Sequence, residues 1–252
     1  AAKLSIAKNQ GPEQTCVLNY EDDVLRERAR ELSAHIVFFS SLRTLEEGIY
    51  LDGDKIIYAH DGRKEEVLST DELNILGRHN HENAMAATAM ALNYGVSMEH
   101  IRQALRSFQA VEHRIEYVTE KRGVRFYNDS KGTNPDAAIK GIQAMDRPTC
   151  LIGGGYDKQS EYTEWINSFD GKVKKLVLIG QTREKIAKAA DACGFHDYVF
   201  ADSLQEAVDI CYENAQNGDA VLLSPACASW GMFPNYEVRG KMFKEMVHAL
   251  KE

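Results

Sequence analysis

The sequence has 252 residues, of which 44% are hydrophobic and 27% are charged. This length allows two domains of ordinary size, and the balance is typical of a globular protein with a buried core. No run approaches about 18 consecutive apolar residues, and the first residues have no secretory signal pattern, so we expect no membrane association. The formal net charge of −8, with no stripe of Lys and Arg between aromatic residues, argues against nucleic-acid binding.

The five cysteines are odd in number, and no two of them form a Cys-x-x-Cys pair. This pattern argues against a disulfide scaffold and against a zinc site, and it favours a reducing compartment. We therefore expect a cytoplasmic protein whose cysteines are free.

The first 110 residues mix helical and strand-like patterns. In chain order, the predicted elements are a helix over 21–33, strands over 36–39, 49–51, 55–58 and 66–68, and helices over 83–94 and 98–108. The residues Asp52-Gly53-Asp54 indicate a hairpin turn between two of these strands. Because apolar strands are few and we find no parallel βαβ unit, we expect residues 1–110 to be the rear part of a larger α/β domain.

From about residue 111 the pattern becomes a regular alternation. Strands predicted over 124–128, 149–152, 176–179, 198–200 and 220–223 alternate with helices near 135–145, 160–168, 183–193 and 203–215, and a last helix covers 237–250. Short apolar strands that alternate with helices predict a mostly parallel sheet covered on both faces. We therefore predict the α/β fold class, with a Rossmann-like domain over 111–252.

The loop after the first strand of this second domain is rich in polar side chains. If the loop is extended, Asp129, Lys131 and Thr133 point the same way and place an acceptor, a cation and a hydroxyl together. Ligands of open parallel sheets bind beyond the carboxyl ends of the strands, which is where this loop lies. The alternative is a polar turn in which Thr133 or Asn134 caps the next helix, with Pro135 in its first turn.

Two further loops follow strands of the same sheet. Gly153-Gly154-Gly155 allows a ligand to approach the backbone closely, and Lys158 offers a charge for a carboxylate or phosphate, although a flexible turn explains the spacing equally simply. The loop after residue 223 contains two hydroxyls and Cys227, which we interpret as a packed small residue because no nucleophile motif surrounds it.

The first domain contains one candidate ligand site. Asn80 and Asn83 stand three residues apart at a predicted helix start, so they share a face, and paired amides there can hold an adenine or an anion. The alternatives are ordinary helix capping and, with less support, metal binding by His79 or His81. Arg114 lies close to the predicted domain junction.

Four segments together resemble one family. They are Gly77 to Asn83, His113-Arg114, Asn128 to Asn134 and Ser224 to Ser229. Their order and spacing resemble the Mur ligases, and the strings N-D-S-K-G-T-N and S-P-A-C-A-S resemble the branch that adds D-glutamate. The resemblance covers essentially all 252 residues.

The resemblance implies ATP-dependent amide formation in peptidoglycan precursor synthesis. A muramoyl-L-alanine carboxylate would take the γ-phosphate of ATP, and the amine of D-glutamate would attack the acyl phosphate. The implied cofactors are ATP and Mg²⁺, and the implied substrates are D-glutamate and UDP-N-acetylmuramoyl-L-alanine, whose main site would lie in an N-terminal domain outside this chain. We expect a monomer.

The resemblance also assigns residues to roles. Asn80 and Asn83 would hold the adenine side of ATP, and Arg114, Asp129 and Lys131 would hold its ribose and phosphates, with Lys131 also catalytic. The residues implied to contact D-glutamate are Thr133, Lys158, Ser229 and Tyr236. Relatives commonly have phenylalanine at the position of Tyr236, and some have a smaller apolar residue at the position of Trp230.

Ala1-Ala2-Lys3 resembles the family's motif around a carbamylated lysine that helps to bind magnesium, which makes Lys3 a candidate catalytic and metal-binding residue. No G-x-x-x-x-G-K-[ST] loop occurs in the chain, so we expect a C-terminal fragment without turnover of its own. Two alternatives remain open. One is a dinucleotide-binding oxidoreductase, although the chain has no G-x-G-x-x-G, and the other is a non-catalytic ligand-binding module.

Overall fold

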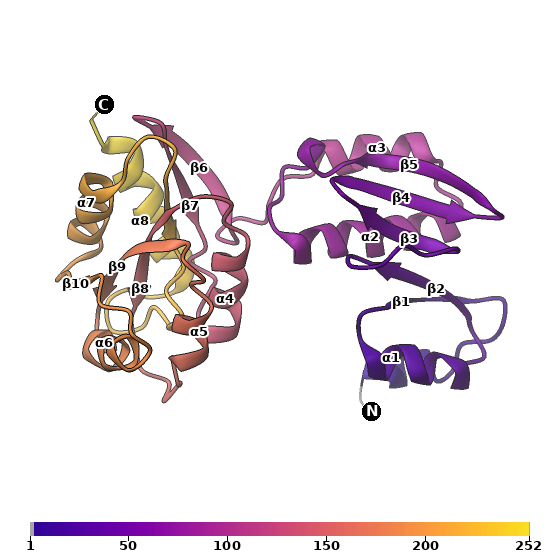
Figure 1. Cartoon of the computed structure of the whole chain (residues 1–252), viewed down its shortest axis with the longest axis horizontal. Coiled ribbons are helices and arrows are strands. Elements are labelled where there is room, and N and C mark those ends of the chain that lie inside the picture. Colours follow the sequence, from indigo (N-terminus) through magenta and orange to yellow (C-terminus); the bar gives the residue numbers. More distant parts are fainter. Residues whose placement is uncertain (1–2, 252) are drawn as a thin grey trace. The chain divides into compact units, whose positions relative to one another are not determined.

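The computed structural model describes residues 3–251, except for the side chain of Lys3. The chain divides into two compact units, Ala1–Gln109 and Ala110–Glu252 (Figure 1). We call them unit 1 and unit 2 and describe each by itself. No helix in the described part of the chain is both long enough and apolar enough to cross a bilayer.

Unit 1 is a five-stranded sheet in the order β1-β2-β3-β4-β5. Its strands are β1 (Thr15–Asn19), β2 (His35–Ser40), β3 (Gly48–Asp52), β4 (Lys55–His60) and β5 (Arg63–Ser69). Its helices are α1 (Asp23–Arg28), α2 (Arg78–Asn93) and α3 (Met98–Ser107), with short 3₁₀ turns at Lys3–Ala7, Ala29–Glu31 and Thr70–Glu72. The predicted hairpin is confirmed, because Asp52 pairs with Lys55 in the antiparallel ladder of β3 and β4.

Our expectation that unit 1 lacks a parallel βαβ unit is wrong. Strand β1 runs parallel to β2, and α1 connects the two. We did not predict β1, because its apolar run, Cys16 to Leu18, is short and lies between the polar residues Thr15 and Asn19. The predicted helix over 21–33 is shorter and ends as a 3₁₀ turn.

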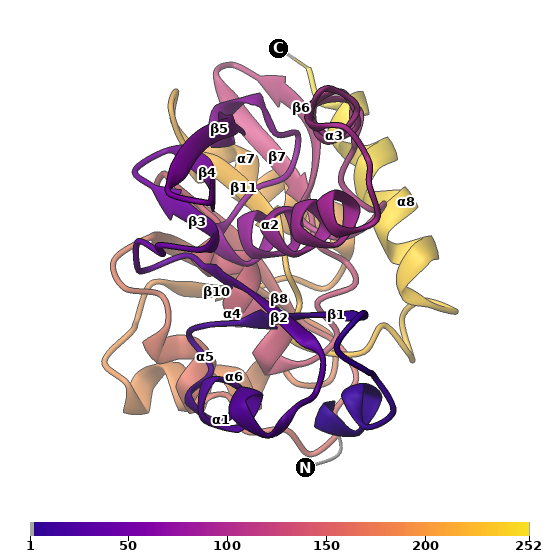
Figure 2. The same ribbon diagram turned by 90° about the vertical axis from the view of Figure 1, so that its right-hand side faces the viewer.

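The core of unit 1 lies between the sheet and helices α2 and α3. Met85 and Ala89 of α2 are almost completely buried, and they pack with Ile49, Ile56 and Ile101. Helix α2 contacts β1, β2 and β3, whereas α3 contacts β5, so the two helices cover one face of the sheet (Figure 2). Small alanines along α2 allow this close approach to the strands.

Unit 2 is a six-stranded sheet in the order β10-β9-β8-β11-β7-β6. Its strands are β6 (Glu116–Lys121), β7 (Val124–Asn128), β8 (Thr149–Gly154), β9 (Val173–Ile179), β10 (Tyr198–Phe200) and β11 (Ala220–Leu223). Five strands are parallel, and only the edge strand β6 is antiparallel to its neighbour. The predicted α/β class with a mostly parallel sheet is therefore confirmed.

Helices cover both faces of this sheet. They are α4 (Pro135–Gln143), α5 (Thr163–Asn167), α6 (Arg183–Ala192), α7 (Leu204–Asn214) and α8 (Tyr236–Ala249). Helices α4, α5 and α6 form one layer, while α7 and α8 pack together on the other (Figures 1 and 2). Three predicted strands, β7, β10 and β11, match the structure residue for residue, whereas β6 was not predicted.

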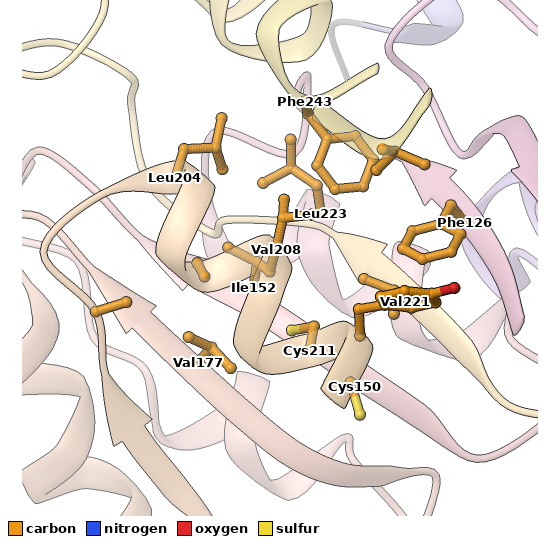
Figure 3. Close-up of a cluster of buried hydrophobic side chains, with 14 of the residues drawn as sticks. Phe126, Cys150, Ile152, Val177, Leu204, Val208, Cys211, Val221, Leu223 and Phe243 are labelled. Atoms are coloured by element: carbon orange, nitrogen blue, oxygen red, sulfur yellow. The ribbon is translucent and has the colours of Figure 1, made fainter. Parts of the chain in front are cut away.

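The core under α7 explains why that helix forms at this place. Leu204, Val208 and Cys211 follow the i, i+4, i+7 pattern, and all three are buried. Figure 3 shows them facing strand residues that include Ile152 and Val177. The central strands β8 and β11 are buried on both faces, which accounts for their apolar sequences.

Candidate functional site

The carboxyl ends of β7, β8 and β11 meet at one edge of the unit 2 sheet, because β11 lies between β8 and β7. Their loops are joined by backbone hydrogen bonds. The Asp129 N–H donates to the Leu223 carbonyl over 2.8 Å, and the Gly154 N–H donates to the Pro225 carbonyl over 2.8 Å. The three loops that the sequence analysis selected therefore come together at the edge where open parallel sheets bind ligands. We call this place the carboxyl edge.

The loop after β7 is a turn rather than an extended segment. The Gly132 N–H donates to the Asp129 carbonyl over 2.8 Å, and Asn134 caps α4 through the Ala137 N–H, as the capping alternative predicted. The turn gives Asp129 and Lys131 different surroundings, because Asp129 is 4% exposed whereas Lys131 is only half-buried. The expectation that the side chains of Asp129, Lys131 and Thr133 point the same way from an extended loop is therefore wrong.

The Asp129 carboxyl group forms the centre of a buried contact. The Ser224 hydroxyl donates to Asp129 Oδ2 over 2.6 Å, and the Ile115 N–H donates to the same carboxyl group. A side chain at Gly132 or Gly141 would place its Cβ within 2.6 or 2.9 Å of Oδ2. Burial raises the pKa of Asp129 to about 7, although the Ser224 and Ile115 hydrogen bonds oppose the shift.

A buried arginine ties two of the loops to α8. Arg239 is completely buried, and its guanidinium donates to the hydroxyl and the carbonyl of Ser130 over 2.9 and 2.7 Å. Its Nη1 also donates to the Cys227 carbonyl over 3.2 Å. Burial lowers the pKa of Arg239 to about 10, so the side chain remains charged at neutral pH. The loops after β7 and β11 thus share one anchor.

The glycine loop after β8 is fixed rather than flexible. Gly154 adopts a φ of 99°, and a Cβ there would lie 2.2 Å from the Ile179 carbonyl oxygen. The Gly155 N–H donates to the Thr182 hydroxyl over 3.0 Å, and the Thr182 N–H returns a bond to the Gly155 carbonyl over 3.1 Å. Cys227 packs beside Thr182 with its sulfur 3.3 Å from the hydroxyl, and burial raises the pKa of its thiol. The interpretation of Cys227 as a packed residue is confirmed.

Both candidate lysines of the carboxyl edge rest on aromatic rings. Lys158 Nζ lies 4.9 Å from the centre of the Trp230 ring, and Lys131 Nζ lies 5.7 Å from that of Tyr236. Within residues 3–251, neither ammonium group forms a salt bridge with a carboxylate. Two positive charges at one sheet edge therefore remain available to an anionic ligand.

The two hydroxyl candidates lie on the same loops. Thr133 is half-buried and follows Lys131, whose carbonyl accepts its N–H over 2.8 Å. Ser229 is 3% exposed and lies in the loop after β11, directly before Trp230. Arg114 is exposed between His113 and Ile115, which are both buried and have φ values of 67° and 47°.

In unit 1 the amide pair is formed as predicted. Asn83 Nδ2 donates to Asn80 Oδ1 over 3.4 Å, so the two side chains share the face at the start of α2. Asn80 also bonds to the chain that leads into α2, because its Nδ2 donates to the Leu76 carbonyl over 2.7 Å. Ordinary helix capping is not observed, because the N-cap of α2 is Gly77 and no side chain caps it, and the ligand-binding interpretation stays a prediction. Burial lowers the pKa of His81, which keeps its imidazole neutral.

Two family models match the chain: "Mur ligase middle domain" over residues 1–91 and "Mur ligase, glutamate ligase domain" over residues 113–227. Proteins named UDP-N-acetylmuramoylalanine--D-glutamate ligase are similar over almost the whole chain. The one from Lachnoclostridium phytofermentans is 57% identical over 251 residues, and the one from Lachnospira eligens is 52% identical over 248.

The chain belongs to the Mur ligase family.

As a Mur ligase, it spans 55% of the length of these two relatives, which cover 100% and 98% of it. Solved structures confirm the fold. A D-alanyl-D-alanyl-adding Mur ligase from Acinetobacter baumannii aligns with a TM-score of 0.66 and 20% identity, covering 97% of this chain and 54% of its own. A MurF ligase from Thermotoga maritima in complex with ADP aligns with a TM-score of 0.60 and 16% identity, covering 98% of this chain and 56% of its own.

The buried anchors of the carboxyl edge, Ser224 and Arg239, are not predicted from the sequence of this Mur ligase. Ser224 belongs to one of the family-like segments but has no predicted role, and Arg239 lies outside all of them. The sequence does contain one indication that Arg239 is buried. It precedes the buried Phe243 by four residues and therefore lies on the apolar face of α8. The side chain of Lys3, proposed as catalytic and metal-binding, lies outside the described residues.

The buried Asp129 predicts a pH dependence of stability. Its pKa of about 7 in the folded Mur ligase exceeds the unfolded value of about 3.9, so the folded state holds the extra proton between these values. The stability that this extra proton gives the folded state is fully present below about pH 4 and is lost as the pH rises through about 7. Between these values the free energy of unfolding falls by up to about 1.4 kcal/mol per pH unit. We expect Asp129→Asn to remove this loss. Urea denaturation of both proteins at pH 5 and pH 8 measures the difference, and an identical pH dependence would contradict it.

Proposed function

We propose that this chain provides the D-glutamate site, and part of the nucleotide site, of an ATP-dependent ligase that extends UDP-N-acetylmuramoyl-L-alanine. The observation behind this proposal is the pair of lysines at the carboxyl edge, Lys131 and Lys158, which form no salt bridge with any carboxylate of the described residues. The two similar relatives are named for adding D-glutamate, and D-glutamate is an anion that needs such charges. Membership of the Mur ligase family also argues against the alternative that the chain is a dinucleotide-binding oxidoreductase.

The reaction proposed has two steps. The L-alanine carboxylate oxygen attacks the γ-phosphorus of ATP, and the bond to the β–γ bridging oxygen breaks, which releases ADP. The neutral amine of D-glutamate then attacks the acyl phosphate carbon, loses a proton, and inorganic phosphate leaves as the amide bond forms. The residues of this chain would position the amino acid and neutralise charge that develops on oxygen.

The D-glutamate contacts are proposed for four residues of the carboxyl edge. Lys158 would pair with a carboxylate, and the hydroxyls of Thr133 and Ser229 would donate hydrogen bonds. Tyr236 stands at the start of α8, where its ring lies beside Lys131 and its carbonyl accepts the Ser130 hydroxyl over 2.8 Å. A contact through its backbone is independent of whether the ring is tyrosine or phenylalanine.

The nucleotide contacts are proposed for both units. The adjacent amides of Asn80 and Asn83 match the donor and acceptor edge of adenine, and Arg114 and Lys131 provide cationic groups for ribose and phosphates. Asp129 is buried and would act indirectly. Its carboxyl group accepts the N–H of Ile115, the residue after Arg114, and so holds the backbone beside Arg114. Mg²⁺ bound with ATP supplies charge neutralisation at the phosphates, and Lys3, when carbamylated, would help to hold it.

We further propose that these 252 residues do not turn ATP over by themselves, because they contain no G-x-x-x-x-G-K-[ST] loop. Without turnover of its own, the chain would be a ligand-binding module. The five free cysteines support a reducing, cytoplasmic location, and we propose a monomer. Phosphate release from ATP in the presence of both substrates would contradict the proposed inactivity.

A thermal-shift titration tests the D-glutamate site. We expect D-glutamate to raise the Tm of the chain, because a ligand that binds only the folded state stabilises it. L-Glutamate is the matched control and should produce no shift at the same concentration. Lys158→Ala should weaken D-glutamate binding about 10- to 100-fold, as loss of a charged hydrogen bond of about 1.5 to 3 kcal/mol implies. Equal shifts with both enantiomers would contradict a stereospecific site.

A further inference from the structure

The loop that contains Lys158 is held by its neighbour Asp157. The Asp157 carboxylate lies 3.5 Å from Lys185 Nζ and accepts the Gln159 N–H over 2.7 Å. The Asp157 N–H in turn donates to the Gln181 side chain over 3.3 Å. The acidic group nearest in sequence to Lys158 is thus occupied by a different lysine and by backbone. Among the residues that the structure describes, no carboxylate forms a salt bridge with Lys158.

An aromatic pair lies beside this lysine. The Tyr156 and Trp230 rings meet edge to face with their centres 5.6 Å apart, and the Tyr156 N–H donates to the Ala228 carbonyl over 2.9 Å. The Trp230 side chain is 53% exposed, so one of its faces is accessible to the Lys158 ammonium group 4.9 Å from the ring centre. This distance is within the range of a cation–π contact.

We propose that Trp230 is a positioning residue that holds the Lys158 ammonium group for a carboxylate of the amino-acid substrate. This inference rests on the proposed function of the carboxyl edge. Tyr156 supports the indole ring from the side, and the backbone bond to Ala228 joins the two loops that present the ring and the lysine.

An aromatic ring as the partner of Lys158 leaves the charge of the lysine intact, whereas a carboxylate partner does not. A carboxylate partner would fix Lys158 but would also neutralise its charge and compete with the substrate carboxylate for the same donors. An aromatic face attracts the cation through its quadrupole and leaves its N–H donors free to point at a ligand. Trp230 therefore restricts the flexible lysine without reducing its charge, which lowers the entropy loss on binding.

The first test is D-glutamate binding by isothermal titration calorimetry. Trp230→Leu should weaken binding about 2- to 5-fold, which corresponds to a cation–π contact of about 0.5 to 1 kcal/mol, whereas Trp230→Phe should retain most of the affinity. The matched control is Phe200→Leu, which removes another exposed ring from unit 2, one that lies 5.6 Å from Arg183. It should leave binding unchanged.

A double-mutant cycle separates positioning from direct contact. If Trp230 acts through Lys158, Trp230→Leu should have no further effect on affinity once Lys158→Met has been introduced. Additive effects of the two substitutions, or an unchanged affinity of Trp230→Leu beside a wild type that binds D-glutamate, would overturn the proposal.

A ligand-free test distinguishes this inference from the proposed function. Trp165 and Trp230 are the two tryptophans of the chain, and Trp165 is completely buried, so collisional quenching reports on Trp230. We expect Lys158→Met to reduce quenching by iodide at low salt and not by neutral acrylamide, since the ammonium group attracts iodide to the ring. Lys188→Met, which removes an exposed lysine of α6, is the control. Iodide quenching that is unaffected by Lys158→Met would overturn the contact, whereas failure of the wild type to bind D-glutamate would overturn the proposed function instead.

Discussion

Replacing Arg239 with methionine is expected to lower the free energy of unfolding of unit 2 by about 3 to 5 kcal/mol. The side chain is completely buried and donates three hydrogen bonds, two to Ser130 and one to the Cys227 carbonyl. Methionine fills a similar volume but leaves these acceptors without donors in the interior. Arg239→Lys should restore little of the loss, because an ammonium group lacks the planar fork that reaches both loops.

Urea denaturation followed by tryptophan emission measures this effect, since both tryptophans lie in unit 2. The matched control is Arg183→Met. Arg183 is partly exposed and forms a 2.7 Å ion pair with Asp202, so its loss should change stability by about 1 kcal/mol or less. A loss for Arg239→Met no larger than that of the control would contradict its role as the anchor of the two loops.

Replacing Gly154 with alanine is expected to destabilise unit 2 by about 2 to 5 kcal/mol. The φ of 99° is unfavourable for any residue with a side chain, and the new Cβ would lie 2.2 Å from the Ile179 carbonyl oxygen. Because that oxygen belongs to the backbone of the neighbouring strand, the overlap requires β8 and β9 to separate. The glycine loop at the carboxyl edge should therefore tolerate no side chain here.

Gly171→Ala separates the two contributions to this effect. Gly171 also has a positive φ, 72°, but no atom lies within 4 Å of a Cβ at that position. We expect a loss of about 1 to 2 kcal/mol from backbone strain alone. If Gly154→Ala and Gly171→Ala lose the same stability in urea denaturation, the close approach of β8 and β9 is not what requires glycine at position 154.

The fold was most predictable where apolar strands are short and bounded by turns. Strands β7, β10 and β11 were predicted to the residue, because each is a compact run between polar loops. Strands β1 and β6 were missed for a shared reason. Both lie at an edge of their sheet, where β1 alternates between half-buried and buried residues and β6 contains no buried residue. This weakens the hydrophobic pattern in both sequences.

The candidate site was predictable in its location but not in its contacts. The position of three loops at one sheet edge follows from the parallel topology alone. The bonds that fix those loops join residues far apart in sequence, such as Ser224 with Asp129 and Arg239 with Ser130. No local spacing encodes such pairs, so the sequence did not indicate that Asp129 would be buried rather than presented to a ligand.

The most direct test of a D-glutamate site at the carboxyl edge is an NMR titration of the ¹⁵N-labelled chain. We predict that D-glutamate shifts amide signals in the loops that contain Lys131, Lys158 and Ser229, and that L-glutamate at the same concentration leaves them unchanged. Signals of the opposite edge, such as those near Gly218, should not move with either enantiomer. Shifts confined to other parts of the chain, or identical shifts with both enantiomers, would contradict this assignment.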